Sequence, residues 1–301
     1  MRLTPRGMLA QPRTAGAGVP GNAGRAIDMS GIDAAQLTGR QAREREYHRA
    51  FAERQAAIVD TPVAFDVTDD TARRPWNAYW SLYDLIIAAG LGGKRVLLPG
   101  CGFGADAIRL AHLGADVSAF DLSEESIDIA RQRAARHGHD TIDFAVMPSE
   151  NLTYADSCFD AVVFVDILHH VDIAATMQEI RRVLKPGGLV LGDELYTHSS
   201  LQKIRDSRLV AGPLYRVMRR WIYGEDVPYI TEDEHKIDER ELAIVSDAMQ
   251  RWDADYFGIA EGRLFPSRLR WASRIDRSLI RIGGRLAPML GGRVVFSGTL
   301  G

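Results

Sequence analysis

The chain has 301 residues, of which 46% are hydrophobic and 26% are charged, a composition typical of a globular protein with an ample core. Its net charge is −3, so we expect no nucleic-acid partner. Two cysteines are too few for a disulfide framework, and no Cys/His cluster has zinc-ligand spacing, so neither disulfides nor a metal are expected. The low cysteine count fits a reducing, cytoplasmic location. The most apolar stretch, residues 161–168, is short and contains Asp166, so no membrane-spanning helix is expected.

The first 28 residues differ in composition from the rest of the chain. Residues 1–26 are rich in arginine, glycine, proline and alanine and contain no acid. They lack the apolar segment of a secretory signal, and their prolines and glycines would break the amphipathic helix of a mitochondrial leader. We therefore predict a disordered tail over 1–28, with Met29 as the better start residue.

Residues 29–93 predict an N-terminal helical region. A polar helix is expected over 34–59, in which Tyr47 is one of the few apolar residues that recur at helical spacing. A second helix ends before the glycines of 90–93. It carries aromatic residues at near-helical spacing, which favours a core position over a lid: Trp76, Tyr79, Trp80 and Tyr83.

Residues 94–195 alternate between strands and helices and form the predicted central domain. The strands are too apolar to be buried on one face only, so they predict a parallel sheet covered on both faces. We expect strands at 95–98, 116–120, 142–146, 161–165 and 189–195, and helices at 105–113, 124–137 and 173–184.

Residues 196–301 predict a substrate-side region of helices and two late strands. Helices are expected at 201–223, 239–249 and 267–282, and strands at 253–259 and 293–297. The helix at 267–282 and the residues after it combine an apolar stripe with arginines. A solvated helix face is the plainer interpretation; the sharper one is a docking surface for anionic lipid or a phosphate-bearing substrate.

The motif VLLPGCGFG at 96–104, followed by Asp121, is the most informative feature of the chain. A strand, a glycine loop, a helix start and an acid at the end of the next strand together form a nucleoside-cofactor site. The loop alone is ambiguous, because residues 100–105 fit both G-x-G-x-G and the dinucleotide pattern G-x-G-x-x-A.

Other motifs in order and spacing are similar to those of the class I S-adenosylmethionine-dependent methyltransferases: PSENL at 148–152, FDAVVFVDILHHV at 159–171 and RRVLKPGG at 181–188. Residues 45–50 and 229–236 resemble, more weakly, the lid helix and C-terminal part of the bacterial "type 11"-like small-molecule branch. The resemblance implies an α/β, Rossmann-like, doubly wound seven-stranded sheet, mostly parallel with one antiparallel strand. It also implies an N-terminal helical lid and a C-terminal helical insertion.

The resemblance further implies S-adenosyl-L-methionine as cofactor and assigns residues to it. The loop residues Gly100, Cys101, Gly102 and Gly104 would pass under its methionine half, and Asp121 would bind the ribose. Leu122 would contact the adenine, and Ser149 and Glu150 would lie at the adenine edge. Val165 and Asp166 would line the sulfonium end, and Tyr47 would act as a lid. Two positions depart from the family pattern, since Leu98 and Pro148 stand where an acid is usual. Each could cost about 1.5–3 kcal/mol of cofactor binding.

Methyl transfer from a sulfonium mainly requires alignment and exclusion of water, but a hydroxyl acceptor also needs a base. Candidates follow the fourth and fifth strands, where active sites of open parallel sheets lie. The catalytic candidates are His170, His198 and Glu194, with Asp166 and His169 nearby. One of His169 and His170 could instead be structural, Glu194 could orient a neighbour, and His198 could shape the substrate site.

We therefore expect a methyltransferase acting on a small-molecule or lipid-linked acceptor, with oxygen as the favoured atom. Peripheral membrane contact is part of the lipid-linked version. The alternatives are a non-catalytic cofactor-binding module, suggested by Leu98 and Pro148, and an NAD-type oxidoreductase, which the LHHV and LKPGG motifs disfavour. Nucleic-acid methylation is disfavoured because the Asn/Asp-Pro-Pro-aromatic motif is missing after the fourth strand.

Overall fold

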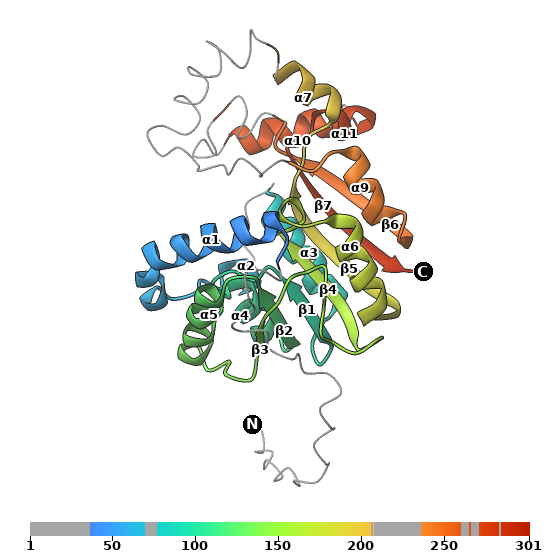
Figure 1. Cartoon of the computed structure of the whole chain (residues 1–301). Helices are drawn as coiled ribbons and strands as arrows, with labels where there is room; N and C mark the ends of the chain where they lie inside the picture. Colours follow the sequence, from blue (N-terminus) through green and yellow to red (C-terminus); the bar gives the residue numbers. More distant parts are fainter. Residues whose placement is uncertain are drawn as a thin grey trace, which may run out of the picture.

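The computed structural model describes residues 37–69, 77–205, 207, 236–259, 265, 271–282 and 284–301 (Figure 1). The predicted tail, Trp76 and most of the helix expected at 201–223 lie outside the described residues, as do residues 229–235 of the YITEDEHK motif. No helix within the described ranges is both long and apolar enough to cross a membrane.

A seven-stranded sheet in the order β3-β2-β1-β4-β5-β7-β6 forms the centre of the structure. β7 pairs antiparallel with both β5 and β6, and the pairs among the first five strands are parallel. The predicted mostly parallel sheet with one antiparallel strand is therefore confirmed. The strands are β1 (Arg95–Pro99), β2 (Asp116–Asp121), β3 (Asp143–Val146), β4 (Phe159–Val165), β5 (Leu184–Leu195), β6 (Met249–Phe257) and β7 (Arg293–Leu300).

Helices cover both faces of the sheet, and two hydrophobic cores result (Figure 1). The neighbours Leu97 and Leu98 of β1 are both buried but belong to opposite cores, as the alternation of side chains along a strand requires. The flanking helices are α3 (Ala78–Ala89), α4 (Ala105–His112), α5 (Glu124–Arg136), α6 (Ile173–Val183) and α9 (Glu239–Ser246).

The remaining elements lie N-terminal to the sheet or follow β4, β5 and β6. Thr38 caps the start of α1 and forms a capping box with Gln41, so the helix begins where its cap dictates. These elements are α1 (Gly39–Arg54), η2 (Ala56–Asp60), α2 (Asp66–Asp69), η3 (Leu168–His170), α7 (Ser199–Arg205), α10 (Ala272–Ile282), η5 (Gly284–Leu286) and α11 (Ala287–Leu290).

Strands β5 and β6 begin earlier than the sequence predicts. β5 starts at Leu184, because residues 185–188 form an irregularity in the ladder with β4 and do not interrupt the strand. β6 starts at Met249, where a helix end was expected, since α9 already stops at Ser246. β6 is half exposed and polar along much of its length, so its strand signal is weak.

Candidate active site

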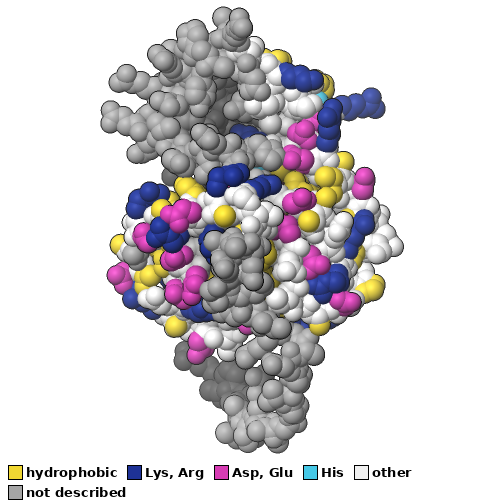
Figure 2. All heavy atoms as spheres, in the orientation of Figure 1, with side chains coloured by type: hydrophobic (Ala, Val, Ile, Leu, Met, Phe, Trp, Pro, Cys, Tyr) yellow, Lys and Arg dark blue, Asp and Glu magenta, His cyan; other side chains and the backbone are white. Residues whose placement is uncertain are grey.

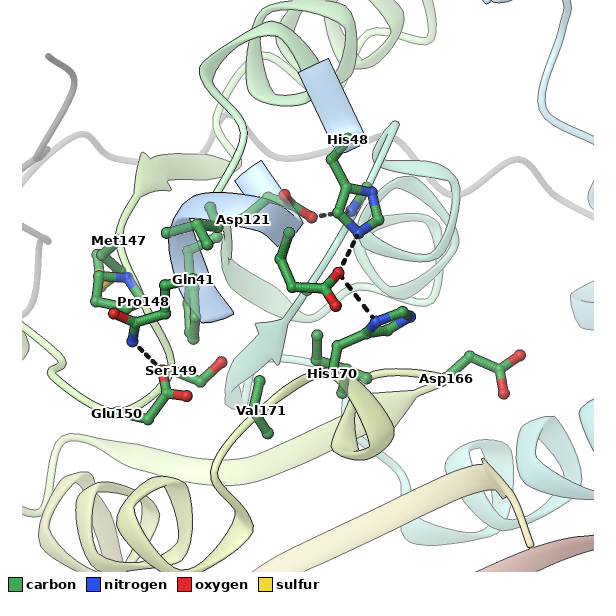
Figure 3. Close-up of a pocket in the computed structure, with 16 residues that line it drawn as sticks. Gln41, His48, Asp121, Met147, Pro148, Ser149, Glu150, Asp166, His170 and Val171 are labelled. Atoms are coloured by element: carbon green, nitrogen blue, oxygen red, sulfur yellow. Dashed lines mark hydrogen bonds and ion pairs between the residues drawn. The ribbon is translucent and has the colours of Figure 1, made fainter. Parts of the chain in front are cut away.

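A pocket opens at the carboxyl ends of β1, β2 and β4, and α1 lies over it (Figure 3). This is the edge where open parallel sheets bind their ligands. Its lining comes from α1, the glycine loop and the segments after β2, β3 and β4: Gln41, Glu44, His48, Gly100, Gly102, Phe120, Asp121, Leu122, Met147, Pro148, Ser149, Glu150, Asp166, Ile167, His170 and Val171.

The glycine loop turns with left-handed backbone at Gly100, Gly102 and Gly104, whose φ values are 61°, 49° and 76°. A Cβ atom at Gly100 would lie 2.3 Å from Ile167 Cδ1, and one at Gly104 would lie 2.8 Å from Ala130 Cβ. At Gly102 it would meet no atom within 4 Å. Gly100 and Gly104 are thus fixed by close packing, whereas Gly102 presents bare backbone to the pocket.

The carboxylate of Asp121 holds the loop in place. Its Oδ2 accepts a hydrogen bond of 2.9 Å from the Gly102 amide, and its Oδ1 accepts one of 3.0 Å from the Ser123 amide. Each oxygen retains a second acceptor site, so the carboxylate can still receive hydrogen bonds from a diol in the pocket.

Helix α1 is tied to both sides of the pocket. Gln41 Nε2 donates a 3.0 Å hydrogen bond to Glu150 Oε2, and the Asp172 amide donates to the other oxygen of Glu150 at 2.9 Å. Arg40 donates a 3.2 Å hydrogen bond to the carbonyl of His169. The helix therefore closes over the pocket through contacts with the loop after β3 and with η3.

Asp166 follows β4 with a φ of 49°, a left-handed conformation that is uncommon for a non-glycine residue. Its Oδ1 accepts a 2.7 Å hydrogen bond from Arg293 of β7, whose Nε donates to Asp193 at 2.9 Å. Asp193 is buried, and this burial raises its pKa to about 7 despite the opposing effect of Arg293. The C-terminal hairpin thereby braces one wall of the pocket.

Glu44 and His48 of α1 meet His170 of η3 at the pocket, and Figure 3 labels the two histidines. His170 Nδ1 lies 3.2 Å from Glu44 Oε2, and His48 Nε2 lies 3.6 Å from the same oxygen. The side chain of Glu44 is only 7% exposed. Burial alone would raise its pKa, but the two imidazoles outweigh burial and lower the pKa of Glu44 to about 2.

The other predicted catalytic residues lie elsewhere. Glu194 is fully buried; it accepts hydrogen bonds from the amides of Leu168 (2.6 Å) and Leu195 (2.8 Å) and contacts His169 Nδ1 at 2.5 Å. This fits the alternative role of orienting a neighbour. His198 lies 3.9 Å from Glu239 and is not among the pocket residues.

Several residues assigned to the cofactor by resemblance do not line the pocket: Tyr47, Cys101, Gly104 and Val165. Tyr47 stacks near Phe51 and lines a separate depression on α1. Cys101 is buried, and burial raises the pKa of its thiol. The sequence predicted no pocket role for Gln41 or Glu44, and it placed His48 only within the resemblance of residues 45–50 to a lid helix. The Glu44–His48 spacing, which places both side chains on one helix face, was the available signal.

Comparison with known proteins supports the interpretation of the glycine loop. Residues 97–192 match the family model of a methyltransferase domain. Ubiquinone biosynthesis O-methyltransferase of Methylocella silvestris is 38% identical over 106 residues, which cover 35% of this chain and 41% of that protein. Phthiotriol/phenolphthiotriol dimycocerosates methyltransferase 1 of Mycobacterium ulcerans is 29% identical over 181 residues, 58% of this chain and 64% of that protein. The chain thus spans less than two thirds of these relatives.

The fold is also shared with solved structures. Geranyl diphosphate C-methyltransferase from Streptomyces coelicolor superposes with a TM-score of 0.53 at 15% identity, covering 88% of this chain and 99% of that one. The [4+2]-cyclase SpnF superposes with a TM-score of 0.52 at 19% identity, covering 86% and 95%. Taken together, the sequence matches and the sheet show that residues 97–192 form a methyltransferase domain with the class I fold, for which S-adenosylmethionine is the cofactor.

Proposed function

We propose that this protein transfers a methyl group from S-adenosylmethionine to a hydroxyl oxygen of a small or lipid-linked acceptor. The observation that carries the proposal is the continuity of one pocket. It runs from the glycine loop and Asp121, which suit a nucleoside cofactor, to His170, which can serve an acceptor.

The residues that would hold the cofactor follow from the lining. The bare backbone at Gly102 would face the methionine half, and Asp121 would accept the ribose hydroxyls. Ser149 and Glu150, with Leu122, would contact the adenine, and Asp166 would lie at the sulfonium end. When bound, the cofactor supplies a methyl group already activated on sulfur, so the chain has to align the acceptor and exclude water.

His170 distinguishes oxygen from other acceptor atoms in this proposal. A hydroxyl must lose its proton as the new bond forms, and a base within reach of the acceptor accelerates that loss. The carboxylate of Glu44 lies beside that imidazole, with Oε2 at 3.2 Å from His170 Nδ1. Glu194 and His198 are weaker candidates, because Glu194 is occupied by backbone amides and His198 lies outside the pocket.

The lipid-linked version of the acceptor is supported by α10 and the residues after it. Large apolar side chains are exposed there, including Ile282 at 87% and Leu286 at 53%. Figure 2 shows Lys and Arg side chains beside hydrophobic ones in the upper part of the molecule, where Figure 1 places α7, α10 and α11. A basic, amphipathic surface suits contact with anionic lipid. The relative from Mycobacterium ulcerans is, by its name, a methyltransferase of phthiotriol dimycocerosates.

Methyl transfer is tested by incubating the protein with methyl-labelled S-adenosylmethionine and a metabolite extract of cells that contain it. We expect label in a compound whose fragmentation shows an O-methyl group. His170→Ala should lower the rate by about 100-fold or more, the usual contribution of a general base. Label on carbon or nitrogen would contradict the choice of oxygen, and bound cofactor without any labelled product would favour the non-catalytic module.

A further inference from the structure

Glu44, His48 and His170 form a group that the methyl-transfer proposal uses only in part. Glu44 and His48 lie one turn apart on α1, and His170 approaches from η3 on the other side of the pocket. We propose that these three side chains bind a divalent metal ion of the zinc type, whose open position takes the acceptor hydroxyl. This inference rests on the proposed function and adds a chemical class of ligand to the same pocket.

The spacing of the three side chains fits a shared cation. Zinc binds His nitrogen and carboxylate oxygen at about 2.0–2.2 Å in a tetrahedral arrangement, which separates neighbouring ligand atoms by about 3.3–3.5 Å. The two separations from Glu44 Oε2 are 3.2 Å and 3.6 Å, and all three ligand atoms lie within 4.8 Å of one another. Both values exceed the usual 2.7–2.9 Å of a charge-assisted hydrogen bond.

Two buried polar atoms of this group lack hydrogen bonds. Glu44 Oε2 and His170 Nδ1 are inaccessible to water, and neither has a hydrogen-bond partner in the described part of the chain. A buried acceptor and a buried ring nitrogen without hydrogen bonds are costly. A cation placed between them would bind both, which explains why the two atoms face each other without hydrogen-bond geometry.

A second group of similar composition, Asp166, His169 and Glu194, is less suited to a metal. Both oxygens of Glu194 already accept hydrogen bonds from backbone amides, and one of them also contacts His169 Nδ1. Asp166 Oδ1 accepts a hydrogen bond from Arg293. The lone pairs of this second group are therefore used by the protein itself.

Two His and one carboxylate leave a fourth position open, as in catalytic zinc sites. An acceptor hydroxyl bound there loses its proton to water more easily, because the cation stabilises the resulting oxyanion. That oxygen then forms a bond to the methyl carbon, the carbon–sulfur bond breaks, and its electron pair stays on the sulfur of the departing thioether. With the metal bound, His170 Nδ1 would be a ligand and not a base, so the metal would replace direct proton transfer to His170 in the proposed function.

The test uses the full-length protein stripped with a chelator and then dialysed against zinc. We expect about one zinc per chain by elemental analysis, and Co²⁺ in its place should give the visible absorption of a four-coordinate site. Glu44→Gln and His48→Gln should each weaken zinc binding by about 100-fold or more, since each removes a ligand. Glu46→Gln is the matched control, because Glu46 lies on the same helix but pairs with Arg49 at the surface.

Titration of the same proteins with S-adenosylhomocysteine separates this inference from the proposed function and reports that each variant is folded. Stoichiometric zinc that is lost in both variants and kept in Glu46→Gln supports the site. Wild type that binds S-adenosylhomocysteine but no zinc overturns the metal site and leaves the proposed function standing. Zinc that binds equally well to Glu44→Gln and His48→Gln also overturns it, because the ion then lies elsewhere.

Discussion

At Gly100 the backbone performs two tasks that no other residue could combine. Its φ of 61° lies in the left-handed region, and a Cβ atom would press on Ile167 at 2.3 Å. Ile167 itself lines the pocket, so any displacement of its side chain changes the shape of the cofactor site. The glycine therefore matters both for the stability of the turn and for the ligand.

We predict that Gly100→Ala lowers the free energy of unfolding by about 2–4 kcal/mol, through backbone strain and overpacking together. It should also weaken binding of S-adenosylhomocysteine by more than the control does. Gly138→Ala is that control, because Gly138 has a similar φ of 72° but open space around it. Denaturant unfolding and calorimetric titration measure the two effects; equal losses in both variants would show that the contact with Ile167 is unimportant.

The sequence predicted some residues of the pocket and not others. The motif places Gly100, Gly102 and Asp121 in the pocket, since a strand, a turn and a helix start fix local geometry. No such motif predicts that Glu44 and His48 line the pocket. Their positions there depend on how α1 docks against η3, a contact between segments far apart in the sequence. The i, i+4 spacing indicates only that Glu44 and His48 share a helix face.

At the scale of elements, the alternating apolar runs between β1 and β5 predicted the central sheet well, because strands buried on both faces have an unambiguous composition. Prediction was weaker after β5. β6 is polar and half exposed, so its start was placed four residues late, and the continuation of β5 through Lys185–Gly188 was missed. Tertiary pairing overrode the local turn signal there.

Helix α10 and the residues after it form a surface that we expect to bind anionic lipid. Ile275, Leu279 and Ile282 follow one helix face and are exposed, whereas Asp276 on another face is buried. Arginines accompany the apolar face at Arg281 and Arg285. We predict that the protein sediments with vesicles of mixed phosphatidylcholine and phosphatidylglycerol but not with phosphatidylcholine alone.

Reversing both charges with Arg281→Glu and Arg285→Glu should weaken this vesicle binding by about tenfold or more, because each basic residue near an anionic surface contributes about 1 kcal/mol. Arg131→Glu on α5 is the control, since Arg131 is 40% exposed and outside this surface. Vesicle binding that the double variant leaves unchanged, or that does not depend on anionic lipid, would refute the contact.

At the scale of the whole molecule, the fold by itself does not determine the reaction. SpnF shares the fold and is named a [4+2]-cyclase, whereas the Streptomyces coelicolor protein of the same fold is named a C-methyltransferase. What supports methyl transfer here is the combination of the matched domain, the glycine loop with Asp121, and a pocket that continues to His170. At the two departures from the family pattern, Leu98 is buried in the core and Pro148 lines the pocket, so neither position supplies an acid to the cofactor.

The central claim is that this pocket binds the nucleoside cofactor, and calorimetric titration with S-adenosylhomocysteine tests it most directly. We predict one binding site per chain in the wild type and no measurable binding in Asp121→Ala, because the carboxylate both holds the loop and receives the ribose. Asp128→Ala on the outer surface of α5 should bind as the wild type does. The absence of any binding heat or thermal stabilisation in the wild type, or full binding in Asp121→Ala, would contradict the account.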